Sequence, residues 1–195
     1  IVDLDRERCI NHFKALGASG IEQLLGYYIK TGFFQDFEKG NIGDDEFRKR
    51  LRLQLQSDAS DEALNEAWCS FLVGIPTYKL KSLLQLRKKY KVFVLSNTNC
   101  LHWDYACNEM FKYDGYKVTD YFDNIFLSFK MHDAKPNLSI FKTVLSETNI
   151  NPEETLFLDD SQDNCDSAMA LGIHTKLVMP KENWALTFKQ YENHI

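Results

Sequence analysis

Several features that would mark a membrane-bound, secreted or nucleic-acid-binding protein are missing from this sequence. No apolar run is long enough to cross a bilayer, and no signal peptide is recognisable. The five cysteines are odd in number and contain no CxxC pair, which argues against a disulfide framework or a zinc site. The net charge of -5 offers no basic field for nucleic acid or anionic lipid. These absences favour a cytoplasmic protein that binds neither membrane nor nucleic acid.

What the sequence does contain is ample material for a folded core. Its 195 residues are 44% hydrophobic and 26% charged, which is an ordinary composition for a globular protein. The length suits one domain, or one compact domain that carries an insertion. No internal repeat or low-complexity segment interrupts the chain.

The first part of the chain, from about Arg6 to Leu72, has a helical pattern and no strand-like run. Residues 44–55 place Phe47, Leu51 and Leu55 on one helix face. Breaks that contain glycine separate shorter helices. This pattern predicts a small helical bundle. Four aromatic residues gather in it, and core packing is their default interpretation: Tyr27, Tyr28, Phe33 and Phe34.

The second part of the chain, from about residue 77, alternates helical patterns with short apolar runs. Strands are predicted at residues 91–99, 124–128, 155–159 and 173–178. Helices are predicted at residues 79–90, 101–111, 138–148, 162–171 and 184–191. Short strands without polar alternation, separated by helices, indicate a parallel sheet that is covered on both faces. The predicted fold class is therefore α/β, with a Rossmann-like parallel sheet and a helical bundle.

Polar side chains follow the predicted strands at the edge where ligands bind in such sheets. The first strand ends in Ser96 and Asn97, the segment after the second delivers Lys135, and the third ends in Asp159 and Asp160. Hydroxyl, amide and ammonium groups neutralise phosphate oxygens, and carboxylates are the hard ligands that Mg²⁺ takes. The sequence therefore predicts a phosphate held beside a magnesium ion.

The adjacent carboxylates of Asp159 and Asp160 are the unusual part of this set. Taken alone, the pair fits a surface turn or a helix N-cap, because Asp is common at both. At the end of a buried strand, however, two like charges repel each other unless a cation compensates them. A bound divalent cation explains the pair in its context.

Three segments of the chain resemble motifs of the haloacid dehalogenase superfamily of hydrolases. They are "VLSNTN", "AKP" and "FLDDSQDN", and they occur in the order and spacing of the second, third and fourth motifs of that superfamily. The resemblance covers essentially the whole chain and is nearest to bacterial sugar-phosphatase members. It implies a helical cap at residues 6–76, a core domain at 77–195, and a linker at 1–5. One or two of the cap aromatics would then face the cleft and select substrate.

The resemblance also implies a reaction and a role for each site residue. Ser96, with Asn97 beside it, would bind the phosphoryl oxygens, and Lys135 would bridge the phosphate and the nucleophile. Asp160 would ligate Mg²⁺, and Asp159 would support the ion directly or through water. The implied activity is hydrolysis of a small phosphorylated metabolite, such as a sugar phosphate, through an aspartyl-phosphate intermediate.

The aspartate nucleophile of the family is not obvious in this sequence. "IVDLD" offers Asp3 and Asp5, which are spaced like a nucleophile and its proton-donating partner. A buried central strand needs several apolar residues before the nucleophile, and only Ile1 and Val2 are available. The helical pattern also begins at once after Asp5, where the family has a turn and a flap. We therefore interpret Asp3 and Asp5 as linker residues and expect the nucleophile upstream of Ile1.

Two other functions share this fold. A metal-free dehalogenase is disfavoured because adjacent carboxylates beside a nucleophilic aspartate would suppress each other's ionisation. A non-catalytic binding relative would keep the fold without the chemistry. The sequence also contains His102, His132 and His174, and since none pairs with a second histidine at metal spacing, we expect surface or lid positions. Asp163 falls in a first helical turn, where the resemblance makes it a partner to the metal ligands.

Overall fold

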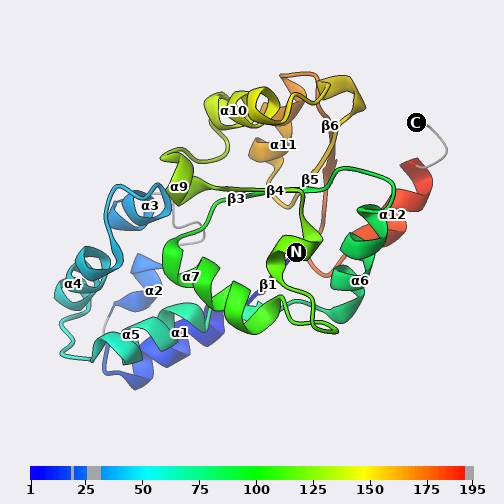
Figure 1. Ribbon diagram of the computed structural model, residues 1–195. Coiled ribbons are helices and arrows are strands. Elements are labelled where there is room, and N and C mark those ends of the chain that lie inside the picture. The colour runs from blue at the N-terminus through cyan, green and yellow to red at the C-terminus, as the bar shows by residue number, and fades with distance from the viewer. Residues whose placement is uncertain (19, 26–31, 192–195) are drawn as a thin grey trace. The chain divides into compact units, whose positions relative to one another are not determined.

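The computed structural model describes residues 1–18, 20–25 and 32–191, and the chain forms two compact units, residues 1–132 and 133–195 (Figure 1). The first unit contains a helical bundle and a pair of parallel strands. The second contains another pair of parallel strands with its helices. None of the helices in the described ranges is long and apolar enough to cross a membrane.

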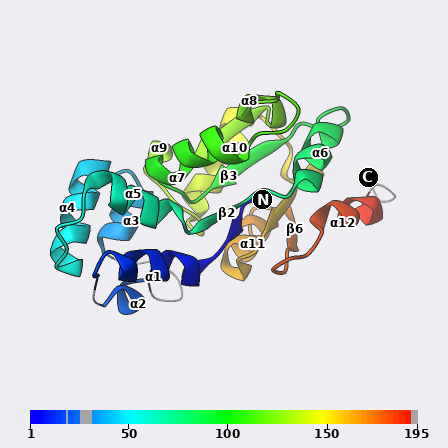
Figure 2. The ribbon, with the colours of Figure 1, turned by 90° about the horizontal axis from the view of Figure 1, so that it is seen from below.

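The described residues of the first unit include five helices that form the bundle, which Figure 2 shows from below. They are α1 (Arg6–Ala15), α2 (Ile21–Leu24), α3 (Phe33–Glu38), α4 (Asp44–Leu55) and α5 (Asp61–Cys69). Aromatic rings fill its core, where Phe34 packs against Phe47 and Trp68 at centroid distances of 5.7 and 5.4 Å. Phe33 and Phe34 therefore pack as core residues as predicted, whereas Tyr27 and Tyr28 lie outside the described residues.

Two short strands at the base of the bundle were not predicted. β1 (Asp3–Leu4) pairs antiparallel with β2 (Leu72–Gly74), so the segments that enter and leave the bundle run side by side. Periodicity does not reveal such a pair, because strands of two and three residues are too short to show alternation. The pairing makes residues 1–5 and 70–76 a double connection to the helices.

The rest of the first unit surrounds a parallel strand pair. β3 (Phe93–Ser96) pairs in register with β4 (Asn124–Leu127), so Ser96 lies opposite Leu127. The accompanying helices are α6 (Thr77–Leu86), α7 (Cys100–Tyr105), the π-helical turn η1 (Ala106–Met110), α8 (Val118–Tyr121) and α9 (Ser128–Met131). Because β3 and β4 run in the same direction, the residues after Ser96 and after Leu127 emerge at the same edge.

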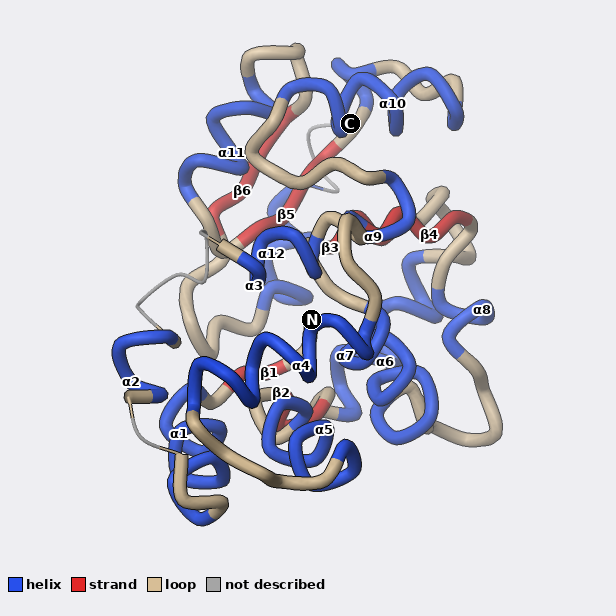
Figure 3. The backbone as a smooth tube through the Cα atoms, turned by 90° about the vertical axis from the view of Figure 1, so that its left-hand side faces the viewer, coloured by secondary structure: helices blue, strands red, loops and turns tan. Residues whose placement is uncertain are grey.

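The second unit is built around β5 (Leu156–Asp159) and β6 (His174–Leu177), which are also parallel. Figure 3 shows these two strands with α11 (Gln162–Met169) beside them. α10 (Leu138–Thr148), the 3-10 turn η2 (Pro152–Glu154) and α12 (Trp184–Tyr191) complete the unit. Phe141 of α10 meets Phe157 of β5 edge to face at 5.4 Å, which fixes α10 on the strand pair.

Candidate active site

A buried ion pair stands at the carboxyl end of β5. The Lys135 ammonium lies 2.6 Å from Oδ2 of Asp159, and the two side chains are only 8% and 7% exposed. The same ammonium lies 5.4 Å from the centre of the Phe157 ring, a cation–π distance. Because a charged side chain is expensive to bury unless it is paired, each of these two buried groups supplies the partner that the other needs, and the pair is fixed in place.

The remaining oxygen of Asp159 is also occupied. Its Oδ1 accepts hydrogen bonds from the backbone N–H of Ser161 at 2.9 Å and from Nδ2 of Asn164 at 2.8 Å. Asn164 belongs to the first turn of α11, so the helix that follows the strand orients the carboxylate at its end. Three donors, from Lys135, Ser161 and Asn164, therefore hold the Asp159 carboxylate in one orientation.

The neighbouring Asp160 has a different environment. It is exposed, and no residue in the described part of the chain forms a hydrogen bond or ion pair with its carboxylate. Both of its oxygens therefore face solvent and suit a hard cation. Asp159 was expected to support the ion either directly or through water. Because both of its oxygens already accept hydrogen bonds from protein donors, support through water suits it better.

The donor set fits magnesium in a particular way. Among residues 1–18, 20–25 and 32–191, no group of three or more His, Cys, Asp or Glu side chains is arranged to hold a metal ion. Mg²⁺ does not require such a cage, because it keeps several waters and binds through one or two carboxylates plus substrate phosphate. Asp160 supplies one such carboxylate, and the chemistry of this edge is compatible with the ion.

The loop that carries Lys135 is organised by Asp133. Its Oδ1 accepts from the backbone N–H of Ala134 at 2.8 Å and from Nδ2 of Asn137 at 2.7 Å, and its Oδ2 accepts from the Ser139 hydroxyl. One carboxylate therefore fastens the residues on both sides of Lys135. The lysine side chain leaves a loop that is already fixed before any ligand binds.

In the first unit, Ser96 and Asn97 lie where β3 ends, as predicted, and both are half-buried. The next residue is clamped by Ser128, which is fully buried at the start of α9. The backbone N–H of Thr98 donates to the Ser128 hydroxyl at 2.9 Å, and that hydroxyl donates to the Thr98 carbonyl at 2.9 Å. This role of Ser128 was not predicted, although a serine directly after the neighbouring strand β4 is a signal that the sequence contains.

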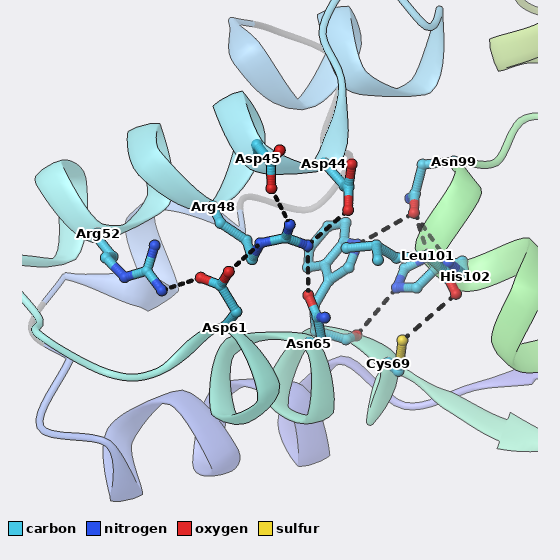
Figure 4. A network of polar contacts seen from close by, with 11 residues as sticks. Asp44, Asp45, Arg48, Arg52, Asp61, Asn65, Cys69, Asn99, Leu101 and His102 are labelled. Carbon is cyan, nitrogen blue, oxygen red and sulfur yellow. Dashed lines mark hydrogen bonds and ion pairs between the residues drawn. The ribbon is translucent and has the colours of Figure 1, made fainter.

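The surface or lid position expected for His102 is wrong. Its side chain is buried, 8% exposed, and belongs to the polar network of Figure 4, which joins α4, α5 and the start of α7. Burial lowers the pKa of His102 to about 4, although its hydrogen bond to the Trp68 carbonyl acts in the opposite direction. The imidazole is therefore neutral at pH 7. Nothing in the local sequence reveals this burial, since the rings that stack on His102 are Trp68 of α5 and Phe71, which lies between α5 and β2.

The acidic residues near the beginning of the chain have local structural partners. The Lys79 ammonium lies 2.6 Å from the Asp3 carboxylate and 2.9 Å from the Ile1 carbonyl. Asp5 caps α1 by accepting a hydrogen bond from the backbone N–H of Arg8 at 2.9 Å. These contacts agree with the interpretation of Asp3 and Asp5 as linker residues, and a nucleophile upstream of Ile1 stays a prediction.

The structure thus brings Lys135 and Asp159 into direct contact and places Asp160 next to them. It places Ser96 and Asn97 together at the end of β3, in the other unit. Each cluster occupies the carboxyl end of a parallel strand, which is where the sequence predicted ligand-binding residues.

Comparisons with known proteins decide the family. The profile of the haloacid dehalogenase-like hydrolases matches residues 77–178. The chain is also 36% identical over 175 residues to the D-ribitol-5-phosphate phosphatase of Bacteroides thetaiotaomicron, covering 90% of this chain and 85% of the relative. This chain belongs to the haloacid dehalogenase-like hydrolase family. The predicted family and the predicted α/β fold class are therefore confirmed.

Solved structures agree with this membership. A crystal structure of a haloacid dehalogenase family enzyme from Bacteroides thetaiotaomicron, an aspartate-to-alanine mutant in complex with magnesium and inorganic phosphate, superposes with a TM-score of 0.94 at 46% identity, covering 96% of this chain and 93% of that one. The structure of a predicted haloacid dehalogenase-like family hydrolase from Porphyromonas gingivalis superposes with a TM-score of 0.90 at 34% identity, covering 98% of this chain and 92% of that one. A true L-2-haloacid dehalogenase matches at 16% identity and TM-score 0.58, a likeness of fold alone.

Proposed function

We propose that this chain is the greater part of a Mg²⁺-dependent phosphatase that hydrolyses a small phosphorylated metabolite of the sugar-phosphate class. The observation that carries the proposal is the buried Lys135–Asp159 pair with the exposed Asp160 beside it. Support comes from the relative that is a D-ribitol-5-phosphate phosphatase, and from the related enzyme that was crystallised with magnesium and inorganic phosphate.

Each site residue has a task in this reaction. Lys135, held in place by Asp159, balances the charge of the incoming phosphate and of the nucleophilic carboxylate, which otherwise repel each other. The Ser96 hydroxyl, with Asn97, hydrogen-bonds the phosphoryl oxygens. Asp160 would hold Mg²⁺, which when bound would supply positive charge to the phosphoryl oxygens. The fixed loops around these side chains mean that little reorganisation accompanies the reaction.

The nucleophile in this proposal is an aspartate that precedes Ile1 in the full-length protein. Asp3 and Asp5 are poor candidates because the first is paired with Lys79 and the second caps α1. Attack by the nucleophile on phosphorus forms an aspartyl-phosphate and releases the alcohol, and water then cleaves the acyl phosphate to give inorganic phosphate. Asp163 has the role in this proposal that the family resemblance implies, as a partner to the residues that bind the metal.

The two alternative functions have less support. A metal-free dehalogenase leaves the exposed Asp160 without a task, and the dehalogenases among the similar structures share only the fold. A non-catalytic binding protein has no need of a lysine whose carboxylate partner is held by two further donors. We also propose the cytoplasm as the compartment, because all five cysteines are free thiols, as expected in a reducing environment.

The test uses the full-length protein and measures phosphate release from D-ribitol 5-phosphate and a panel of sugar phosphates while Mg²⁺ is varied. We expect Asp160→Asn to raise the Mg²⁺ concentration for half-maximal activity and to lower turnover by orders of magnitude. Asp166→Asn is the matched control, because Asp166 is an exposed residue of α11 whose side chain accepts a hydrogen bond only from Gln162 in the described part of the chain. Full activity in the presence of a chelator would refute the proposal.

A further inference from the structure

Two buried polar residues follow the predicted phosphate-binding serine and have no part in the reaction described above. Asn99 is 1% exposed and His102 is 8% exposed. Burying an amide and an imidazole costs free energy unless every polar atom has a partner. Their presence directly after Ser96 and Asn97 calls for a structural or functional reason.

The partners of these two residues form a closed set. His102 Nε2 lies 3.0 Å from the Trp68 carbonyl, which can only accept, so Nε2 carries the proton. Nδ1 is then an acceptor, and Nδ2 of Asn99 donates to it at 3.3 Å. Oδ1 of Asn99 accepts from the His102 backbone N–H at 3.0 Å and from Trp68 Nε1 at 3.4 Å. Every polar side-chain atom of Asn99 and His102 is therefore satisfied.

Contacts with two aromatic rings fix the orientation of the imidazole. His102 stacks on Trp68 with a centroid distance of 4.6 Å and an interplanar angle of 13°, and it lies parallel to Phe71 at 6.0 Å and 11°. Trp68 belongs to α5, whose position is in turn fixed by Arg48 of α4 through Asp61 and Asn65 (Figure 4). The start of α7 is thereby tied to the helical bundle.

The consequence for the β3–α7 loop is that it is held at two adjacent points. The Ser128 hydroxyl hydrogen-bonds the backbone N–H and the carbonyl of Thr98, and the network with Trp68 holds the Asn99 side chain. Ser96, the last residue of β3, and Asn97 directly precede these anchors. A binding loop that is fixed before its ligand arrives loses less entropy on binding, and its donors are aimed correctly.

We propose that Asn99 and His102 are positioning residues for phosphate binding, which hold the Ser96–Asn97 segment in its binding geometry by anchoring it to Trp68 of the helical bundle. The inference rests on the proposed phosphatase function. Its specific claim is that a bundle residue, Trp68, governs phosphate affinity without touching the phosphate.

The decisive variant is His102→Phe in the full-length protein. Phenylalanine keeps an aromatic ring that can stack on Trp68 and Phe71 but removes the hydrogen bonds to Asn99 and to the Trp68 carbonyl. We expect inorganic phosphate to bind about ten-fold more weakly and kcat to fall by a similar factor, because one oriented hydrogen-bond network is lost. The Mg²⁺ concentration for half-maximal activity should not change, since Asp160 is outside the network. A merely structural role would lower the thermal midpoint and leave these binding and kinetic constants unchanged.

Two tryptophan variants complete the test. Trp68→Phe keeps an aromatic ring and the backbone carbonyl but removes the one side-chain hydrogen bond of Trp68, the long 3.4 Å contact to Asn99, so its effect on phosphate binding should have the same direction and a smaller size. Trp184→Phe is the matched control, because Trp184 is a buried tryptophan whose Nε1 has no hydrogen-bond partner among the described residues. It should leave phosphate binding and turnover unchanged. Should His102→Phe fail to fold, Trp68→Phe decides the question by itself.

The outcomes separate the two proposals. Phosphate binding is measured by calorimetry with inorganic phosphate, and turnover is measured with D-ribitol 5-phosphate. A wild-type protein that neither binds phosphate nor hydrolyses phosphate esters would overturn the proposed function and the inference with it. An active wild type whose His102→Phe and Trp68→Phe variants match it in phosphate affinity and kcat would overturn the positioning role alone.

Discussion

The burial of His102 predicts a specific dependence of stability on pH. Burial lowers the pKa of this imidazole from 6.5 to about 4 in the folded protein. The unfolded chain therefore takes up the proton first as the pH falls, and the folded state loses stability through the window from about 6.5 to 4. Above this window the imidazole is neutral in both states and its contribution is constant.

The size of the effect follows from the two pKa values. One pKa unit corresponds to about 1.4 kcal/mol, so the complete titration of His102 removes about 3 kcal/mol of the free energy of unfolding. Between pH 7 and pH 5, where most of the unfolded chains become protonated, the loss is about 2 kcal/mol. That is a large part of the total stability of an ordinary domain.

A second group acts in the opposite direction over the same range. Burial raises the pKa of the Glu38 carboxyl to about 7, so the folded state takes up this proton first and gains stability as the pH falls below 7. The two effects nearly cancel in the wild type, whose stability alone is therefore uninformative. Comparison with His102→Gln, which cannot titrate at this position, isolates the contribution of the histidine.

The assay is urea unfolding of both proteins at pH 7 and pH 5, followed by circular dichroism. The free-energy difference between wild type and His102→Gln should shrink by about 2 kcal/mol from pH 7 to pH 5, because only the wild type carries the histidine penalty. The lower stability of the variant at pH 7 does not enter this comparison. An unchanged difference would show that His102 is not buried as the structure has it.

Three further predictions concern other parts of the chain. Lys135→Ala should abolish turnover and lower the free energy of unfolding by about 3–5 kcal/mol, because it leaves Asp159 buried without its partner. The double variant Lys135→Ala, Asp159→Asn should recover the thermal midpoint but not the turnover. Gly40→Ala should lower the thermal midpoint strongly, because Gly40 has a φ of +66° and a Cβ there would lie 2.1 Å from the backbone oxygen of Phe129. Gly43→Ala is the control and should leave the midpoint unchanged, because a Cβ there meets nothing within 4 Å. Equal midpoints for the two variants would contradict the packing around Gly40. Glu38→Gln should lose about 1 kcal/mol relative to wild type between pH 8 and pH 6 in urea unfolding, and a parallel pair of curves would contradict the raised pKa of Glu38.

The sequence predicted those features of the fold whose cause is local. The helix at residues 138–148 and the helix at 44–55 were found with the same ends, because apolar spacing along a helix is visible in the residues themselves. The strands that end in Ser96 and Asp159 were found because each has at least three consecutive apolar residues before its polar end, a run that indicates a strand within a covered sheet. The position of polar residues after these strands then indicated the site.

Tertiary structure alone decided which side chains meet. Lys135 binds a carboxylate 24 residues away, Ser128 clamps a backbone 30 residues away, and His102 donates to a carbonyl 34 residues away. Asp3, which looks like a nucleophile in the sequence, is paired with a lysine at a separation of 76 residues. The burial of a polar residue cannot be predicted from its neighbours in the sequence, because it depends on which distant apolar residues pack over it. The sequence therefore determined the strands and the chemical groups at their ends, and the packing of distant segments determined which of those groups are charged, fixed and paired.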